Sequence, residues 1–256
     1  LLLFIALTFS LFAQEDKRAA RIVSLSPVLS EIVFALGAGE LLVGRTDWCD
    51  YPSEISAVPS VGGFSGSQVS IESIRSLRAD TVLLSPFMHE RLIPILQRAG
   101  IRIVGLDPNS FVEIFDSIEV IAGLCDRKEE GRILRASLKG RLDELAAARA
   151  SLSATRGAGA VYEIATVFYL LQDEPLMSAG RKSFISMLIE TAGGRNIFDD
   201  VEQAWPLVSM EELLVRRPRF ILVDTGTFER VFPPANTARG RRGALSRLDA
   251  VRSYRL

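Results

Sequence analysis

Apolar and polar positions along the chain follow two periodicities that predict strands and helices in turn. Short apolar runs bounded by turn residues are typical of buried strands, and apolar steps of three and four residues are typical of helices. The predicted strands cover residues 20–25, 41–44, 81–85, 101–106, 160–164 and 220–224. The predicted helices cover residues 28–36, 90–99, 183–192 and 209–215. Short apolar strands separated by helices predict an α/β fold with mainly parallel sheets.

A proline-free stretch over residues 126–155 interrupts this alternation. It is rich in Ala, Leu, Arg, Lys and Glu, and its apolar positions fall at helical spacing at Ile133, Leu134, Leu138, Leu142 and Leu145. One amphipathic helix of this length would span about 40 Å, which suits a bridge between two lobes. The sequence therefore predicts an N-terminal α/β lobe over residues 20–125, a bridging helix over 126–155 and a C-terminal α/β lobe over 157–256.

The first thirteen residues differ from the rest. Leu1 to Ala13 is an apolar run relieved only by Thr8 and Ser10, and a strongly charged segment follows it. Such a run is too short to cross a bilayer core of about 30 Å, but it fits the apolar part of a signal peptide. We therefore expect residues 1–13 to be the remnant of a signal peptide and the protein to be exported, to the periplasm or another extracytoplasmic location.

The charge balance limits the classes of partner. The chain has 30 basic and 31 acidic residues, a formal net charge of −1, and 48% hydrophobic residues. This composition is ordinary for a globular protein and gives no electrostatic basis for binding nucleic acid or an anionic membrane. We therefore expect the protein to bind small molecules or another protein.

Cysteine and histidine are too few to build a disulfide framework or a metal site. Cys49 and Cys125 could pair in an oxidising compartment or could serve separately as small buried residues, and the sequence leaves both options open. The single histidine, His89, has no Cys or carboxylate cluster near it, so no metal site is predicted. We expect His89 on the surface of the predicted helix beside it.

One local pattern occurs twice, in residues 69–84 and 208–223. Aligned without a gap, the pairs are Ser70 with Ser209, Glu72 with Glu211, Ile74 with Leu213, Arg78 with Arg217, and Val82 with Ile221. The two serines are predicted N-caps, which places Glu72 and Glu211 in first helical turns. One such glutamate is explained by the helix dipole alone, but a matched pair suits a two-fold symmetric partner with a basic pocket on each half.

Four segments of the chain carry a family resemblance. They are RIVSLSPVLSEIVFALGAGELLVG, DWCDYP with the following VGGF, IESIRSLRADTVLL, and GGRNIF with WPLVSMEELLVRRP. Through them the chain resembles the substrate-binding proteins of ABC importers for cobalamin and iron complexes, most closely the cobalamin-binding type, over residues 20–223.

The resemblance implies a class III periplasmic binding protein fold, with two α/β lobes joined by one long rigid helix. It also implies a solute-binding protein rather than an enzyme, without a cofactor, monomeric when free and delivering its ligand to a membrane ABC permease dimer. Glu72 and Glu211 fall on the family's permease-docking positions. The family continues beyond the position of Leu256, so the resemblance leaves room for a truncated second lobe.

The resemblance places the ligand in a cleft between the lobes. The matching cleft positions are aromatic: Trp48, Tyr51, Phe64, Phe87 and Trp205. Large rings with few charges suit the flat, mostly apolar face of a cobalt corrinoid or an iron porphyrin. Cobalamin is the expected ligand.

Two alternatives to cobalamin binding follow from other residues. A ferric siderophore or haem is an alternative ligand for the same fold, on the basis of Arg45, Arg181 and Tyr51. Asp224-Thr225-Gly226 spells the signature of an aspartic protease. Such an enzyme needs a second aspartate and a β-rich body, and this chain has one copy in an α/β pattern.

Overall fold

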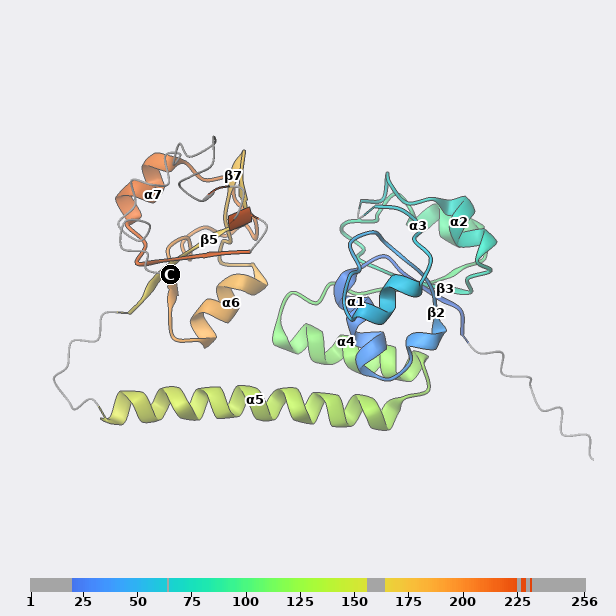
Figure 1. Cartoon of the computed structure of the whole chain (residues 1–256), viewed down its shortest axis with the longest axis horizontal. Coiled ribbons are helices and arrows are strands. Elements are labelled where there is room, and N and C mark those ends of the chain that lie inside the picture. Colours follow the sequence, from blue (N-terminus) through green and yellow to red (C-terminus); the bar gives the residue numbers. More distant parts are fainter. Residues whose placement is uncertain (1–19, 64, 156–163, 225–226, 229–230, 232–256) are drawn as a thin grey trace, which may run out of the picture. The chain divides into compact units, whose positions relative to one another are not determined.

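The computed structural model describes residues 20–63, 65–155, 164–224, 227–228 and 231 of the 256-residue chain (Figure 1). The chain divides into two compact units. Unit 1 comprises Leu1–Asp107 with Ser117–Gly131, and unit 2 comprises Pro108–Asp116 with Arg132–Leu256. Each unit contains a parallel sheet with helices, so the predicted α/β class with mainly parallel sheets is confirmed.

Unit 1 is built on a four-stranded parallel sheet in the order β2-β1-β3-β4. The strands are β1 (Ile22–Ser24), β2 (Leu42–Arg45), β3 (Thr81–Leu84) and β4 (Arg102–Gly105). All residues of β1 and β3 are buried, as expected for central strands covered on both faces. All four strands were predicted from their apolar runs, with ends shifted by one or two residues.

Four helices accompany this sheet along the sequence: α1 (Pro27–Ala35), α2 (Ile71–Ser76), α3 (Ile93–Arg98) and α4 (Phe111–Leu124). Short 3-10 helices cover Gly39–Leu41 and Ser53–Ala57. Helix α1 begins at Pro27, whose fixed φ suits a first turn, and the chain leaves it through Gly37 at φ 66°. Helix α4 was not predicted from the sequence.

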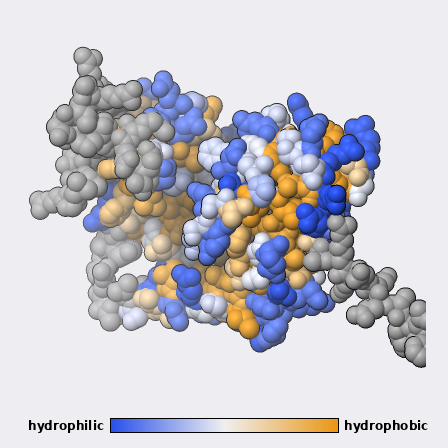
Figure 2. Space-filling view, turned by 45° about the vertical axis from the view of Figure 1, so that its right-hand side comes forward, coloured by the Kyte–Doolittle hydropathy of each residue, from blue (hydrophilic) through white to orange (hydrophobic). Residues whose placement is uncertain are grey.

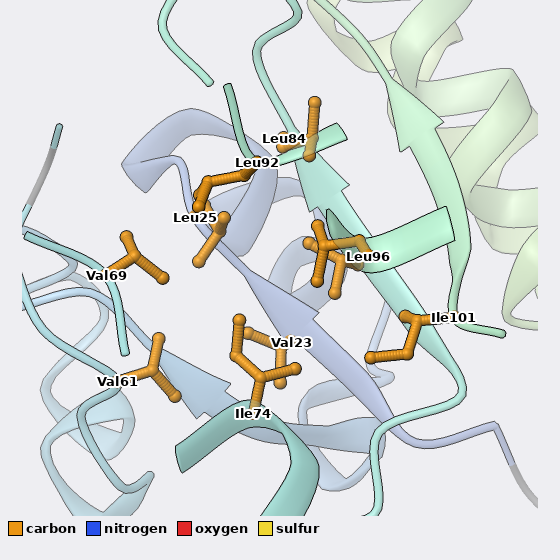
Figure 3. Packing of buried hydrophobic residues seen from close by; sticks show 10 residues of the cluster. Val23, Leu25, Val61, Val69, Ile74, Leu84, Leu92, Leu96 and Ile101 are labelled. Carbon is orange, nitrogen blue, oxygen red and sulfur yellow. The ribbon is translucent and has the colours of Figure 1, made fainter. Parts of the chain in front are cut away.

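One core cluster of unit 1 lies between the sheet and helices α2 and α3. Figure 3 shows its buried side chains, which are Val23, Leu25, Val61, Val69, Ile74, Val82, Leu84, Leu92, Leu96 and Ile101. Nearly all are aliphatic residues of the predicted strands and helices. Val61 and Val69 come instead from the segment before α2, so that segment is packed against the sheet as well.

Unit 2 contains a three-stranded parallel sheet in the order β8-β5-β9 and a small antiparallel pair, β6 with β7. The strands are β5 (Thr166–Leu170), β6 (Gln172–Asp173), β7 (Leu176–Met177), β8 (Arg195–Asn196) and β9 (Phe220–Val223). Its helices along the sequence are α6 (Phe184–Thr191) and α7 (Met210–Arg216). Phe168 and Phe198 meet edge to face, 6.1 Å between ring centroids, at the centre of its core.

The strand predicted over residues 160–164 lies, except for Ile164, outside the described part of the chain. Ile164 itself is not in a strand, and β5, which begins at Thr166, was not predicted. The two-residue strands β6, β7 and β8 were not predicted either, because so short a segment carries no detectable periodicity.

One uninterrupted helix, α5, runs from Lys128 to Thr155, close to the limits predicted for a single amphipathic helix. Asp126, two residues before this helix, has a left-handed backbone with φ 55°. Asp tolerates this conformation better than most residues. Among the described residues, no helix is both long and apolar enough to cross a membrane.

The expectation that His89 lies on a helix surface is wrong. His89 is fully buried, in the turn between β3 and α3, and its Nδ1 donates to the carbonyl of Ser85 at 3.0 Å. The sequence around His89 carries no signal of this burial.

Both cysteines are buried free thiols in the structure. The pKa of the Cys125 thiol is raised to about 11, mainly by burial, with the nearby Arg127 opposing the rise and Glu40 adding to it. Each cysteine therefore serves as a small buried side chain, which is one of the two options that the sequence left open.

Candidate functional site

Three loops of unit 1 leave the carboxyl ends of neighbouring parallel strands. They follow β1 at Leu25, β2 at Thr46 and β3 at Ser85. Ligands of open α/β sheets bind at this edge, because the loops that leave it converge there. Two of the three loops carry aromatic residues predicted to contact the ligand.

Those aromatic side chains are unusually exposed. Trp48 is 64% exposed and Tyr51 is 66% exposed in the loop after β2, and Phe87 is 85% exposed in the loop after β3. Hydrophobic residues also gather on the surface of this unit in Figure 2. Large apolar groups left in water at one edge of a sheet indicate a binding surface rather than a core.

Hydrogen bonds to Ser85 fix the turn that carries Phe87. The Ser85 hydroxyl accepts from the Met88 amide at 3.2 Å, and the Ser85 carbonyl accepts from the His89 amide at 3.0 Å. The buried His89 ring bonds to the same carbonyl. Ser85 and His89 thus fix the turn so that Phe87 points away from the core, a role that the sequence did not reveal.

In unit 2, Trp205 is 43% exposed on a loop that is tied to the segment after β7. The Ser178 amide donates to the Pro206 carbonyl at 3.1 Å, and the Gly180 amide donates to the Ala204 carbonyl at 2.9 Å. The Arg181 amide donates to the Val201 carbonyl at 2.8 Å. A Cβ at Gly180 would lie 2.0 Å from the Gln203 carbonyl oxygen, so only glycine allows this close approach. The Trp205 loop is therefore as firmly anchored as the Phe87 turn.

The predicted site residues are divided between the two units. Trp48, Tyr51 and Phe87 belong to unit 1 and Trp205 belongs to unit 2. Phe64 lies outside the described residues.

The two arginines considered for anionic ligands bond to groups of the protein itself. Arg45 donates to the carbonyls of Thr46, Ile55 and Val58. Arg181 donates to the Asp199 carbonyl and forms an ion pair with Glu202 at 3.3 Å.

The repeated pattern found in the sequence is also a repeat in structure. Ile74 and Leu213 are both fully buried, Arg78 and Arg217 both have left-handed backbones with φ 51° and 47°, and both segments lead into a strand. That strand pairs in parallel with the first strand of its unit, β3 with β1 and β9 with β5. The repeated segments therefore hold equivalent places in the two units.

Glu72 and Glu211 are exposed in the first turns of α2 and α7. Both predicted N-caps are confirmed: Ser70 Oγ accepts from the Ser73 amide, and Ser209 Oγ accepts from the Glu212 amide, each at 3.1 Å. In α7 the Glu212 carboxylate also accepts from the Ser209 amide at 3.0 Å, which completes a capping box. Because Glu212 performs the capping, Glu211 is not required for it.

The described residues give no support to an enzymatic site. No group of three or more His, Cys, Asp and Glu side chains suited to a metal ion occurs in the part of the chain that the structure describes. Asp224 accepts from the Thr227 amide at 2.9 Å just after β9, whereas Thr225 and Gly226 lie outside the described residues. The two larger sheets are parallel and alternate with helices, so the part of the chain that the structure describes does not form the β-rich body that an aspartic protease needs.

Comparison with known proteins agrees with this geometry. The model of the family described as "Periplasmic binding protein" matches residues 22–252. A vitamin B12-binding protein of Vibrio cholerae is 30% identical over 222 residues, which cover 86% of this chain and 76% of that protein. The crystal structure of the periplasmic vitamin B12-binding protein BtuF of Vibrio cholerae has a TM-score of 0.73 at 26% identity, covering 91% of this chain and 85% of that one.

Proteins with other ligands share the fold. The crystal structure of the periplasmic haem-binding protein HutB of Vibrio cholerae also has a TM-score of 0.73, at 19% identity, and covers 91% of this chain and 87% of that one. The family and these relatives consist of binding proteins rather than enzymes.

Proposed function

This chain belongs to the periplasmic binding protein family, and from that premise we propose that it captures a cobalamin-type corrinoid and delivers it to the dimeric permease of an ABC importer. The observation that carries the proposal is the set of exposed rings of Trp48, Tyr51 and Phe87 on loops at one edge of a parallel sheet. Such rings stack on a flat macrocycle and bury a large area with few charges. Trp205, which belongs to unit 2, is a further exposed ring at a position that the family resemblance assigns to the ligand.

The bonding of the arginines supports cobalamin over a ferric siderophore. Anionic siderophores are recognised by cations, and both Arg45 and Arg181 already donate to protein acceptors. Lys182, next to Arg181, also pairs with Glu202, at 3.2 Å. The vitamin B12-binding relatives support the same choice of ligand.

Haem is the second candidate. The exposed Tyr51 hydroxyl belongs to the same loop as Trp48, and a phenolate oxygen can bind haem iron. The haem-binding structures with the same fold favour this alternative but, at their low sequence identity, only at the level of the fold.

A fluorescence titration separates these ligands. The chain has two tryptophans, Trp48 and Trp205, both exposed. We expect cyanocobalamin to quench their emission at micromolar concentrations, and haemin and an anionic ferric siderophore to quench it much more weakly. Quenching by haemin alone would move the assignment to haem, and quenching by none of the three would refute the ligand class.

Substitution of Trp48 tests the aromatic surface itself. We expect Trp48→Ala to weaken cobalamin binding about 10- to 100-fold in calorimetry, since a stacked ring at the centre of a contact is a typical hot spot. The matched control is Phe220→Ala, which removes a half-exposed ring at the amino end of β9 and should leave the affinity unchanged. Equal losses in both variants would show that Trp48 has no special role.

We also propose that Glu72 and Glu211 dock on the permease. Their support is the equivalent placement of two exposed carboxylates in the two units, which complements a partner with two-fold symmetry.

A further inference from the structure

We infer that Arg45 is a positioning residue for ligand binding, because its guanidinium closes residues 46–59 into a fixed loop that presents Trp48 and Tyr51. This inference rests on the proposed function, since the loop carries two of the three exposed rings on which that function is proposed. Arg45 itself does not touch the ligand.

The two ends of the loop lie side by side. The Arg45 amide donates to the Pro59 carbonyl at 3.0 Å, and the Val61 amide donates to the Arg45 carbonyl at 2.7 Å. The chain thus leaves the sheet at the end of β2 and returns beside the same residue. Loops of this length with adjacent ends hold their shape through their own side chains.

The Arg45 side chain spans the loop from its first residue to its last turn. Nη1 donates to the Thr46 carbonyl at 2.9 Å, and Nε donates to the carbonyls of Ile55 at 3.0 Å and Val58 at 3.1 Å. A guanidinium suits this task because its N–H groups form a rigid planar set, which a lysine ammonium cannot reproduce. The half-buried charge is satisfied by carbonyl dipoles rather than by a carboxylate.

Three other side chains fasten the loop to the core of unit 1. Thr46, Cys49 and Ile55 are buried almost completely. The Cys49 sulfur lies 3.3 Å from both the Thr46 hydroxyl and the hydroxyl of Ser30 on α1. Trp48 and Tyr51 flank this buried cysteine in sequence and are themselves mostly exposed, so the anchors hold the loop from inside while the rings face solvent.

A loop held in this way gains affinity without making a contact. Two exposed rings on a mobile loop would lose conformational freedom when a ligand ordered them, and that loss would weaken binding. If the loop is ordered before the ligand arrives, this loss is avoided. Arg45 therefore contributes to binding through Trp48 and Tyr51, not through its charge.

The positioning role can be tested without any ligand. In a Trp205→Phe background Trp48 is the only tryptophan, and its time-resolved anisotropy reports on the motion of the loop. We expect tumbling of the whole protein to dominate the decay, and Arg45→Lys to add a fast component. Arg21→Lys is the matched control, since Arg21 also donates from Nε and Nη2 to a carbonyl of unit 1, that of Leu77, at 3.1 and 2.8 Å. An unchanged decay in Arg45→Lys, or an equal change in Arg21→Lys, would overturn the inference.

A second measurement covers the case in which Arg45→Lys does not fold. The amides of Cys49, Ile55 and Val58 donate to carbonyls within the loop in the unaltered protein. We expect these three amides to exchange hydrogen slowly and at a common rate, as one closed unit. Rapid and unrelated rates would mean that the loop is not fixed, and would contradict the proposal.

The ligand measurement completes the test. We expect Arg45→Lys to weaken cyanocobalamin binding about tenfold, with the affinity of Arg21→Lys unchanged. Failure of the unaltered protein to bind cobalamin would refute the proposed function, while the anisotropy of Trp48 would still decide whether Arg45 positions the loop. Full affinity in an Arg45→Lys variant whose Trp48 is mobile would refute the inference and leave the proposed function intact.

Discussion

At the scale of single residues, several polar side chains of this protein donate hydrogen bonds to backbone carbonyls at turns or at the ends of segments. Arg45 bonds to Ile55, His89 to Ser85, and Arg216 to Ile197. A buried carbonyl without a donor costs free energy, so each of these contacts stabilises one arrangement of the chain over others. Two of them lie directly behind the proposed aromatic surface.

Arg216 is the best example outside that surface. Its guanidinium forms two parallel bonds with Asp200, at 2.7 and 3.0 Å, and lies over the Phe198 ring at 4.6 Å from the centroid. The hydrogen bond to Arg216 lowers the pKa of the Asp200 carboxyl, and the same bond raises the pKa of Arg216. The pair joins the end of α7 to the loop before it.

We expect Asp200→Asn to lower the free energy of unfolding at pH 7 by about 0.5–1 kcal/mol, because the carboxylate is largely exposed and screened by solvent. The pKa of Asp200 is lower in the folded than in the unfolded state, so its contribution is complete above the unfolded pKa. It is lost as the pH falls through the folded pKa. Urea unfolding of both proteins from pH 7 to pH 2 measures this. The control is Asp143→Asn, which breaks an exposed pair with Lys139 and should change stability less. A difference that does not shrink as the pH is lowered would contradict the assignment.

At the scale of elements, the two short helices α2 and α7 are defined mainly by their caps. Each has a serine N-cap, one fully buried side chain facing the sheet, and a left-handed arginine at or just after its end. Helices of six and seven residues are not stable alone, so capping and the buried contact decide whether they form. These helices carry the glutamates proposed to bind the permease.

We expect Ser209→Ala to destabilise unit 2 by about 1 kcal/mol, because it removes the acceptor for the Glu212 amide and breaks the capping box. Chemical denaturation followed by circular dichroism gives the difference. Ser209→Asp retains an acceptor at this position and should recover most of the loss. If the aspartate variant were as unstable as the alanine variant, the cap would not be the cause.

At the scale of the whole molecule, the chain consists of two compact units of the same design. In each, a central strand leads to a serine-capped helix and then to a second strand, and that helix and the strand after it correspond in sequence. The helix dipole favours an acidic residue in either first turn, but it does not explain why both units carry one at the matching position. The repetition of Glu72 and Glu211 at equivalent positions of the two units is the basis for the proposal that they dock on a permease with two-fold symmetry.

We expect the combined substitution Glu72→Ala and Glu211→Ala to abolish stimulation of transport by the reconstituted permease, while cobalamin affinity stays within about twofold. The reason is that both carboxylates are exposed and belong to helices distinct from the aromatic loops. A double variant with Glu119→Ala and Glu144→Ala removes the same charge from exposed positions on α4 and α5 and should transport normally. Normal transport with the first variant would refute docking through these glutamates.

The sequence by itself determined the features that depend on near neighbours. Apolar runs gave the strands of unit 1 within one or two residues, a proline-free periodic stretch gave α5, and Ser70 and Ser209 gave the two caps. These features follow from backbone hydrogen bonding and side-chain spacing over a few residues. The repeat could be identified for the same reason, since it is a pattern along the chain, whereas the aromatic positions came from the resemblance to the family.

Only the tertiary structure decided what depends on contacts between distant residues. It buried His89, left Cys49 and Cys125 as free thiols, and paired the Arg45 guanidinium with carbonyls of the loop after β2. It also set the start of β5 at Thr166 and created the two-residue strands of unit 2. Burial and hydrogen-bond partners of a polar side chain are fixed by which segments meet in space, and a single polar residue in the sequence carries no record of that.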